Sequence, residues 1–309
     1  MRIAIIGGAG FIGTNLAISL SRDHNVKIVD SDATYFNTLK SLNLPVRYQV
    51  SSFSVESDFD SQVKNEDVIY HLASTIIPGN SNQDIAAELE ANVITTVKLL
   101  DACVRQNVSK VVFISSGGAI YGKRSICPIK EDVVTYPITS YGVQKLAIEK
   151  LLYLYRYQTG LDYRIIRLAN PYGPYQRPNG KLGVVTTFVY KALTDGKLEV
   201  YGDGSVVRDF IYIDDAVRGI RKIADGENEI RVYNLGSGKG TSVNEVIAVI
   251  KQTIGKELKV DYIKGRGTDV PVNFLDIKRY EKIYGKLHPL GLKDGIKKTT
   301  EFMKRTGIV

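Results

Sequence analysis

Residues 7–13, Gly7-Gly8-Ala9-Gly10-Phe11-Ile12-Gly13, decide the fold of this chain. They follow a short apolar run at 3–6 and precede a segment whose apolar residues recur at helical spacing. Gly7, Gly10 and Gly13 suit three tasks: a tight turn, a close approach of the backbone to a pyrophosphate, and close packing of helix on strand. The helix N-terminus offers N–H groups to the anion. The stretch therefore predicts a dinucleotide-binding unit.

Asp30 ends the second apolar run, seventeen residues after Gly13. A carboxylate at this place accepts hydrogen bonds from an adenosine ribose hydroxyl and repels a 2′-phosphate. Ser31, Asp32 and Ala33 come next, so no arginine follows directly to bind such a phosphate. We therefore predict NAD rather than NADP as the cofactor.

Short β-branched runs alternate with longer helical patterns through the first 170 residues. This alternation predicts a parallel sheet with helices on both faces, because parallel strands need crossover connections. The expected strands are 3–6, 26–30, 46–50, 67–73, 110–116 and 163–168. The predicted fold class is therefore α/β, with a doubly wound parallel-sheet Rossmann domain and a smaller mixed α/β substrate domain.

The pattern becomes less regular after Asn170-Pro171-Tyr172-Gly173-Pro174, and we place the domain boundary there. Residues 1–170 are predicted to form the dinucleotide-binding domain and residues 171–309 the substrate domain. Residues 208–235 are expected to return to the first domain. Beyond the boundary, helices are expected near 184–195, 214–224, 242–254, 277–284 and 292–305, and strands near 198–201, 210–213 and 231–235.

Composition narrows the class of protein further. The 41 basic and 33 acidic residues give a net charge of +8, but the basic residues are spread out without a dense run or a nucleic-acid motif. We therefore expect a solvated surface with a few arginines directed at a diphosphate, and no nucleic-acid partner.

Cysteines, histidines and apolar runs indicate neither a metal site nor a membrane. Cys103 and Cys127 offer neither a disulfide framework nor metal-ligand spacing, and His24, His71 and His288 are scattered. No run reaches the roughly 18 apolar residues of a membrane span, and the apolar opening lacks the features of a signal peptide. The expectation is a protein of the reducing cytoplasm without a metal ion.

Tyr141 and Lys145 lie one turn apart on one face of a helical segment at 141–159. A phenol with an ordinary pKa of about 10 is a poor base at neutral pH. An ammonium one turn away and a nicotinamidium cation both favour the phenolate. The pair alone is common on surface helices, but beside a dinucleotide site it predicts a catalytic centre.

These features, together with His71-Leu72-Ala73, Asn92 and the segments 115–122 and 167–173, resemble the extended short-chain dehydrogenase/reductase family. Within it, the chain is similar to nucleotide-sugar 4-epimerases, over nearly its whole length. The resemblance implies that Tyr141 removes the proton of the sugar 4-hydroxyl while NAD accepts the C4 hydride. The bound 4-keto intermediate then turns its other face to the hydride. Lys145 is implied to hold the nicotinamide ribose and to tune Tyr141.

The resemblance also assigns binding residues. Those implied to bind NAD are Gly7, Gly10, Phe11, Ile12, Gly13, Asp30, Ser52, Leu72, Ala73, Ser74, Asn92, Ser115, Tyr141, Lys145 and Ala169. Those implied to bind the nucleotide sugar are Ser116, Asn170, Val184, Val185, Leu198, Val200, Tyr201, Arg208, Arg266, Asp269 and Asn273. Asn170 and the two arginines are implied to bind the diphosphate, Asp269 the nucleotide ribose, and residues 198–201 the base.

The turn after the fifth expected strand departs from the family pattern. Gly117 stands where the family usually places a Ser or Thr that polarises the sugar oxygen. The expected hydroxyl donor is therefore Ser116, with Ser115 as the second choice. Gly118 and Ala119 lack the acid and base of a 4,6-dehydratase, and Ala119 lacks the Glu of a decarboxylase. Ile76 replaces a lysine that some epimerases carry, which is expected to weaken the hold on NAD.

Three readings of the function remain open. The leading one is a 4-epimerase of UDP-glucose and UDP-galactose or their N-acetyl forms, because Asn273 replaces a bulky tyrosine at a place that limits sugar size in the family. The second is an NAD(P)H-dependent 4-ketoreductase of a nucleotide-linked 4-keto-6-deoxysugar. The third is a non-catalytic NAD-binding module. The resemblance implies a homodimer paired through the helices near 92–106 and 141–159, whose apolar residues include Leu99, Val104, Leu151, Leu152 and Leu154. The sequence alone instead assigns these leucines to packing on their own sheet.

Overall fold

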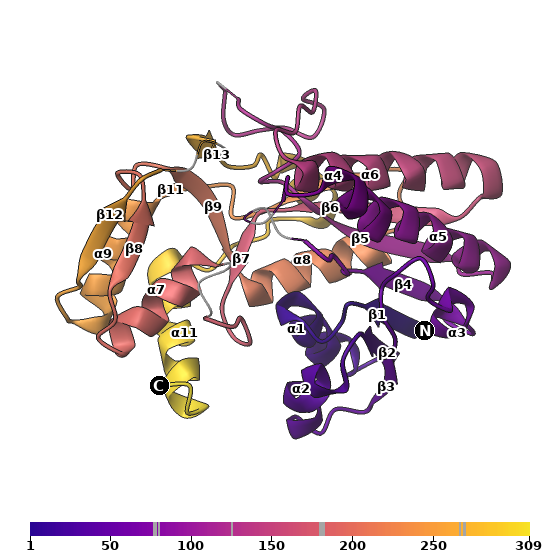
Figure 1. Ribbon diagram of the computed structural model, residues 1–309, viewed down its shortest axis with the longest axis horizontal. Coiled ribbons are helices and arrows are strands. Elements are labelled where there is room, and N and C mark those ends of the chain that lie inside the picture. The colour runs from indigo at the N-terminus through magenta and orange to yellow at the C-terminus, as the bar shows by residue number, and fades with distance from the viewer. Residues whose placement is uncertain (77–78, 80, 125, 179–182, 266, 268–269) are drawn as a thin grey trace.

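The computed structural model describes residues 1–309 except 77–78, 80, 125, 179–182, 266 and 268–269. A parallel sheet forms the centre of the larger part (Figure 1). Its strands, in order across the sheet, are β10 (Val232–Leu235), β6 (Asp162–Leu168), β5 (Lys110–Ser116), β4 (Val68–His71), β1 (Arg2–Ile6), β2 (Asn25–Asp30) and β3 (Val46–Val50). All neighbouring pairs run parallel. The predicted doubly wound sheet is confirmed, and its strand order reverses between β1 and β4, where such sheets bind ligands.

Helices cover both faces of this sheet because its strands are apolar on both sides. Ile3 and Ile5 of β1 belong to the core on one face, whereas Ala4 and Ile6 belong to the core on the other. The first face is covered by α1 (Phe11–Leu20), α2 (Asn37–Ser41), α8 (Ile213–Asp225) and α10 (Lys278–Tyr284). The second is covered by α3 (Phe59–Val63), α5 (Thr95–Arg105) and α6 (Ser140–Thr159).

The smaller part is a mixed α/β domain with its own core, on the left of β7 in Figure 1. Its strands are β9 (Val207–Tyr212), which pairs with β7 (Asn170–Tyr172), β11 (Gly240–Ser242) and β13 (Val272–Asn273), and the pair β8 (Leu198–Tyr201) and β12 (Val260–Ile263). Its helices are α7 (Val184–Leu193), α9 (Val243–Ile254) and α11 (Leu292–Arg305). The segment 208–235 divides: β9 lies in this domain, whereas α8 and β10 lie with the large sheet.

Capping residues mark both ends of α6, and the structure contains short elements that the sequence pattern did not predict. Thr139 caps α6 by accepting a hydrogen bond from the Gly142 N–H, and Gly160 ends the helix with φ of 80°. The helix expected near 92–106 starts earlier, as α4 (Ile85–Leu89) followed by one π-helical turn, η2 (Glu90–Ile94), before α5. A short 3₁₀ turn, η1 (Ala33–Phe36), follows β2. Within the described residues, no helix combines the length and apolar character needed to cross a membrane.

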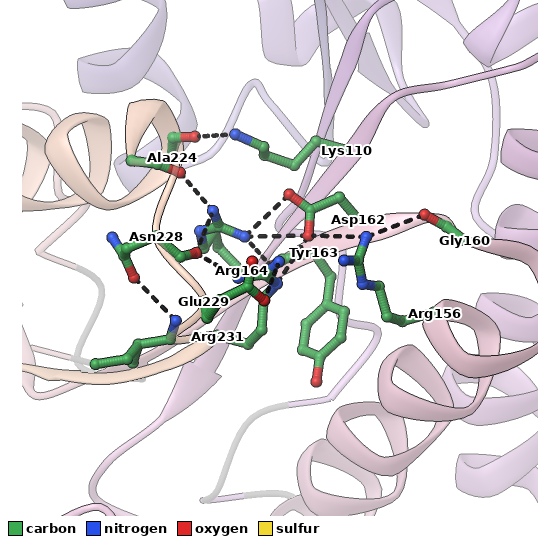
Figure 2. Close-up of polar contacts among 12 residues, drawn as sticks. Lys110, Arg156, Gly160, Asp162, Tyr163, Arg164, Ala224, Asn228, Glu229 and Arg231 are labelled. Atoms are coloured by element: carbon green, nitrogen blue, oxygen red, sulfur yellow. Dashed lines mark hydrogen bonds and ion pairs between the residues drawn. The ribbon is translucent and has the colours of Figure 1, made fainter.

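Cationic side chains hold the C-terminal end of α8 at the amino edge of the sheet (Figure 2). Lys110 donates from Nζ to the carbonyl oxygen of Ala224 at 2.7 Å, and Arg164 donates to the carbonyls of Gly226 and Asn228. Arg164 is also paired with Asp162 at 3.0 Å. The last carbonyls of a helix carry partial negative charge, so these cations stabilise its end. The opposite edge of the sheet, at the carboxyl ends of the strands, is left for the site.

Candidate active site

A cavity of about 620 Å³ lies at the carboxyl ends of β1, β4, β5 and β6 and extends to β8 of the smaller domain. It brings together residues that are far apart in the sequence, and most of the predicted site residues line it. These are Gly7, Gly10, Phe11, Ile12, Gly13, Leu72, Ser74, Ser115, Ser116, Tyr141, Lys145, Ala169, Asn170, Val184, Val185, Val200, Tyr201 and Arg208. One continuous space thus joins the glycine turn, the tyrosine and the expected base-binding strand.

Other predicted residues lie outside the lining of this cavity: Asp30, Ser52, Ala73, Asn92, Leu198 and Asn273. The Leu198 side chain belongs to the core of the smaller domain. Asn92 accepts from the Thr75 N–H at 2.9 Å and donates to the Thr75 hydroxyl at 2.8 Å, so it holds the loop after β4. Arg266 and Asp269 lie outside the described residues.

Ile76, expected near NAD, and Glu199, in the stretch expected at the base, also line the cavity. Sequence reasoning missed another part of the cavity wall, which includes Gln176, Thr187, Phe188 and Lys191. Three of these residues lie on α7, at positions 3, 4 and 7 after Val184. That spacing is one face of a helix. Extending the predicted site from Val184 along this face would have found them, whereas nothing in the sequence marks Gln176.

The glycine turn forms a cradle in which side chains are excluded. Gly7 has φ of +77°, and a Cβ there would lie 2.7 Å from the backbone of Ala73. A Cβ on Gly13 would lie 2.3 Å from the carbonyl oxygen of Gly8. Asp30 accepts a hydrogen bond from the Ala9 N–H at 2.9 Å, so its carboxylate is fixed beside the turn. Among the described side chains none caps the N-terminus of α1, and this free helix end fits a pyrophosphate.

Tyr141 and Lys145 stand side by side at the start of α6. The Lys145 ammonium donates to the Ile114 carbonyl at 3.0 Å and lies 5.7 Å from the centre of the Tyr141 ring. Burial lowers the pKa of Lys145 to about 8, and the negative charge of Glu149 opposes this shift. Burial raises the pKa of Tyr141 to about 12, and a hydrogen bond with Ser116 opposes that shift. The site therefore holds a hydroxyl, a phenol and an ammonium within reach of one another.

The turn at Gly117 has no room for a side chain. A Cβ there would lie 2.6 Å from Cδ1 of Leu275 and 3.1 Å from the carbonyl oxygen of Arg167. Asn273 donates to the Gly117 carbonyl at 3.2 Å and is buried. Leu275 and Asn273 thus occupy the space beside this turn, and Ser116 is the hydroxyl residue that opposes the rise in the pKa of Tyr141.

His71 is a buried core residue. Its Nε2 atom lies 3.0 Å from the Thr96 hydroxyl, and burial lowers its pKa to about 3, so the ring is neutral. The part of the chain that the structure describes contains no group of three or more His, Cys, Asp or Glu residues able to hold a metal ion.

The comparison with known families decides the assignment. Residues 3–236 match the model of the NAD dependent epimerase/dehydratase family. This chain belongs to that family. Its UDP-glucose 4-epimerase relative in Mycolicibacterium smegmatis is 32% identical over 309 residues, covering 98% of this chain and 99% of the relative. The predicted membership of the extended short-chain dehydrogenase/reductases is therefore confirmed.

Solved structures of family members have the same fold over their whole length. The UDP-glucose 4-epimerase of Thermotoga maritima, solved with UDP-glucose, superimposes with a TM-score of 0.90 at 30% identity and 99% coverage of both chains. The UDP-glucuronic acid 4-epimerase of Bacillus cereus, solved with UDP-glucuronic acid and NAD, gives a TM-score of 0.90 at 27% identity, with 99% of this chain and 100% of that chain covered. The protein is thus an enzyme of this family, and NAD is its cofactor, as predicted.

Proposed function

We propose that this enzyme is a UDP-hexose 4-epimerase acting on UDP-glucose and UDP-galactose or their N-acetyl forms. The observation that carries the proposal is the single cavity, which runs from the glycine turn past Tyr141 to the β8 strand. Ser116, which opposes the rise in the pKa of Tyr141, supplies the hydroxyl that Gly117 lacks. Simple redox chemistry at C4 is favoured because Gly118 and Ala119 carry no acid or base.

Tyr141 carries the proton in the proposed mechanism. Burial raises the pKa of Tyr141 in the site without cofactor. The Lys145 ammonium and the positive charge of bound NAD would lower it, so that the phenol would release its proton to solvent and act on the sugar as the phenolate. Ser116 hydrogen-bonds the sugar 4-oxygen as Tyr141 removes its proton. NAD, when bound, supplies the acceptor and donor of the C4 hydride. Tyr141 then returns the proton to the 4-oxygen after the keto sugar has turned its other face.

The remaining predicted residues are assigned in this proposal to the two ends of the substrate and cofactor. Asn170 and Arg208 bind the diphosphate, and Val200 and Tyr201 face the base; both pairs line the cavity. Lys145 holds the nicotinamide ribose. Asp30 receives the adenosine ribose, because its carboxylate is fixed beside the glycine turn. Arg266 and Asp269 keep their predicted roles at the diphosphate and the nucleotide ribose.

We also propose a homodimer of the reducing cytoplasm, paired through α5 and α6. Tyr153, Leu154 and Tyr157 on α6 are 63%, 42% and 81% exposed, which supports an apolar surface on this helix. Leu99 and Leu152 are fully buried against their own sheet, which is where the sequence alone places them. The pairing in this proposal therefore uses the tyrosines.

The test is to incubate the purified protein with UDP-galactose, UDP-N-acetylgalactosamine and UDP-glucuronate separately, without added cofactor, and to resolve the C4 epimers chromatographically. An epimer that the Tyr141→Phe variant does not form supports the proposal and identifies the sugar. Turnover of a nucleotide-linked 4-keto-6-deoxysugar with stoichiometric loss of NADH, and no epimer, would establish the reductase instead. NAD binding without either reaction would indicate the non-catalytic module.

A further inference from the structure

Glu149 is a buried carboxylate close to the catalytic pair that the proposed mechanism does not use. It stands four residues after Lys145 on α6, on the same face, and is 4% exposed. Its oxygen atoms accept a hydrogen bond from the Ser115 hydroxyl at 2.5 Å and pair with Arg167 at 2.7 Å. A buried carboxylate is costly unless such partners satisfy it, so the geometry of Glu149 is closely fixed.

Arg167, on β6, is itself fixed from the side away from Glu149. Its Nη1 atom donates to the Tyr121 hydroxyl at 3.0 Å and to the Glu131 carbonyl at 2.8 Å. Tyr121 in turn donates to the side chain of Asn234 at 2.7 Å. The network therefore connects the end of β5 to β6 and β10. Fully satisfied buried networks of this kind are rigid, which makes Glu149 a fixed charge rather than a mobile one.

The surroundings of Lys145 give this charge a function. From α6 it faces Tyr141 and Glu149, from β5 the Phe113 ring and the Ile114 carbonyl, and from β4 the neutral His71. Among these described groups, Glu149 is the anion that favours the ammonium. Arg167 stands behind the carboxylate and shares its charge.

We propose that Glu149 is a positioning residue, which keeps the Lys145 ammonium charged and, through Ser115, fixes the end of β5 that carries Ser116. This inference rests on the role of Lys145 in the proposed function. Its basis is the contact chain Ser115–Glu149–Arg167. The pKa of Lys145, lowered to about 8 by burial and raised by Glu149, agrees with it. Without the carboxylate, the ammonium would lose its proton at a lower pH.

The test uses two variants, Glu149→Gln and the double variant Glu149→Gln/Arg167→Met. The single change is nearly isosteric but leaves Arg167 unpaired, which is expected to destabilise the fold. The double change removes both charges and keeps the variant foldable for measurement. Lys145→Met is the matched control, because it lacks the titrating group that Glu149 is proposed to hold.

The readout is NAD binding by calorimetry between pH 6 and pH 9.5, after dialysis to remove bound cofactor, in two buffers of different ionisation enthalpy. We expect the unsubstituted protein to lose affinity around the pKa of Lys145, about 8. In Glu149→Gln this midpoint should fall by about one pH unit, and in the double variant it should fall by less, because the Arg167 cation is removed together with the carboxylate. In both variants proton uptake on binding should appear at correspondingly lower pH. Near pH 8 a shift of about one unit weakens binding about fivefold.

Superimposable midpoints, in variants that differ only in thermal stability, would overturn the proposal and leave Glu149 with a purely structural role. In the Lys145→Met control, NAD affinity must not change with pH around 8 if the midpoint is to be assigned to Lys145. This binding experiment does not depend on sugar turnover. Shifted midpoints without any epimer would support the proposed role of Glu149 and refute the proposed epimerase activity. An epimer together with unshifted midpoints would support the epimerase activity and refute the role of Glu149.

Discussion

Replacing Gly117 by serine restores the hydroxyl that the family pattern places beside the tyrosine, and the structure predicts that this change harms the protein. A Cβ at this position would lie 2.6 and 3.1 Å from the two methyl groups of Leu275, and 3.1 Å from the carbonyl oxygen of Arg167. Leu275 is fully buried and the carbonyl belongs to the β6 backbone. Neither neighbour can retreat freely, because interiors are close-packed.

Overpacking of this kind costs about 1–3 kcal/mol. We expect Gly117→Ser and Gly117→Ala to lose that much free energy of unfolding in urea denaturation, since both add the Cβ. Gly118→Ser is the matched control: its Cβ would have no neighbour closer than the Ser116 hydroxyl at 3.9 Å, so its stability should match the parent. In a Leu275→Ala background, Gly117→Ser should cost much less than alone.

The reasoning would be refuted by a Gly117→Ser variant that is as stable as the parent and turns over faster. That result would mean that the turn can move away from the smaller domain and that the missing hydroxyl limits the reaction. Equal losses in the parent and Leu275→Ala backgrounds would show that the clash with Leu275 is not the cause.

Three further predictions follow from burial and contact. Lys145→Met should abolish turnover. It should also raise the free energy of unfolding at pH 7 by up to about 3 kcal/mol, because the native pKa of Lys145, about 8, lies below the usual 10.5. In urea melts at a series of pH values, this gain should vanish as the pH rises from 8 to 10.5. Gly13→Ala should lower the free energy of unfolding by about 3 kcal/mol and weaken NAD binding, since its Cβ would lie 2.3 Å from the Gly8 carbonyl oxygen. Gly10→Ala is the control: the nearest atom to its Cβ would be 3.8 Å away, so thermal melts should show that it is as stable as the parent. Tyr157→Glu should give a folded monomer in sedimentation equilibrium, and an unchanged dimer would exclude α6 as the pairing surface.

The central sheet could be predicted closely because its signals are local. The β-branched runs gave strands β2, β3, β5 and β6 to within a residue, and the glycine turn fixed how the first strand leads into α1. Helices α9, α10 and α11 could also be predicted, from apolar periodicity and from capping residues such as Ser242. Hydrophobic periodicity and capping or turn residues are features of short stretches of chain, so a single sequence shows them.

The parts that escaped prediction depend on long-range contacts. Nothing near Gly117 in the sequence indicates that Leu275 and Asn273 fill the space beside it, because they lie more than 150 residues away. The Ser115–Glu149–Arg167 cluster joins three separate elements in the same way. The short strands β11 and β13 have two or three residues each, too few for a period to show.

The hydrogen bond from Asn273 to the Gly117 carbonyl connects a residue expected to limit sugar size to the turn that follows Ser116, the proposed catalytic hydroxyl. Under the proposed function, this contact couples sugar specificity to the position of the catalytic hydroxyl. A tyrosine grafted at position 273 from a hexose-restricted relative would remove that hydrogen bond and press on the backbone next to Ser116. Residues 117, 273 and 275 are expected to evolve as a linked set, so that each is compatible only with particular partners at the other two positions, and attempts to change the sugar preference should exchange all three together.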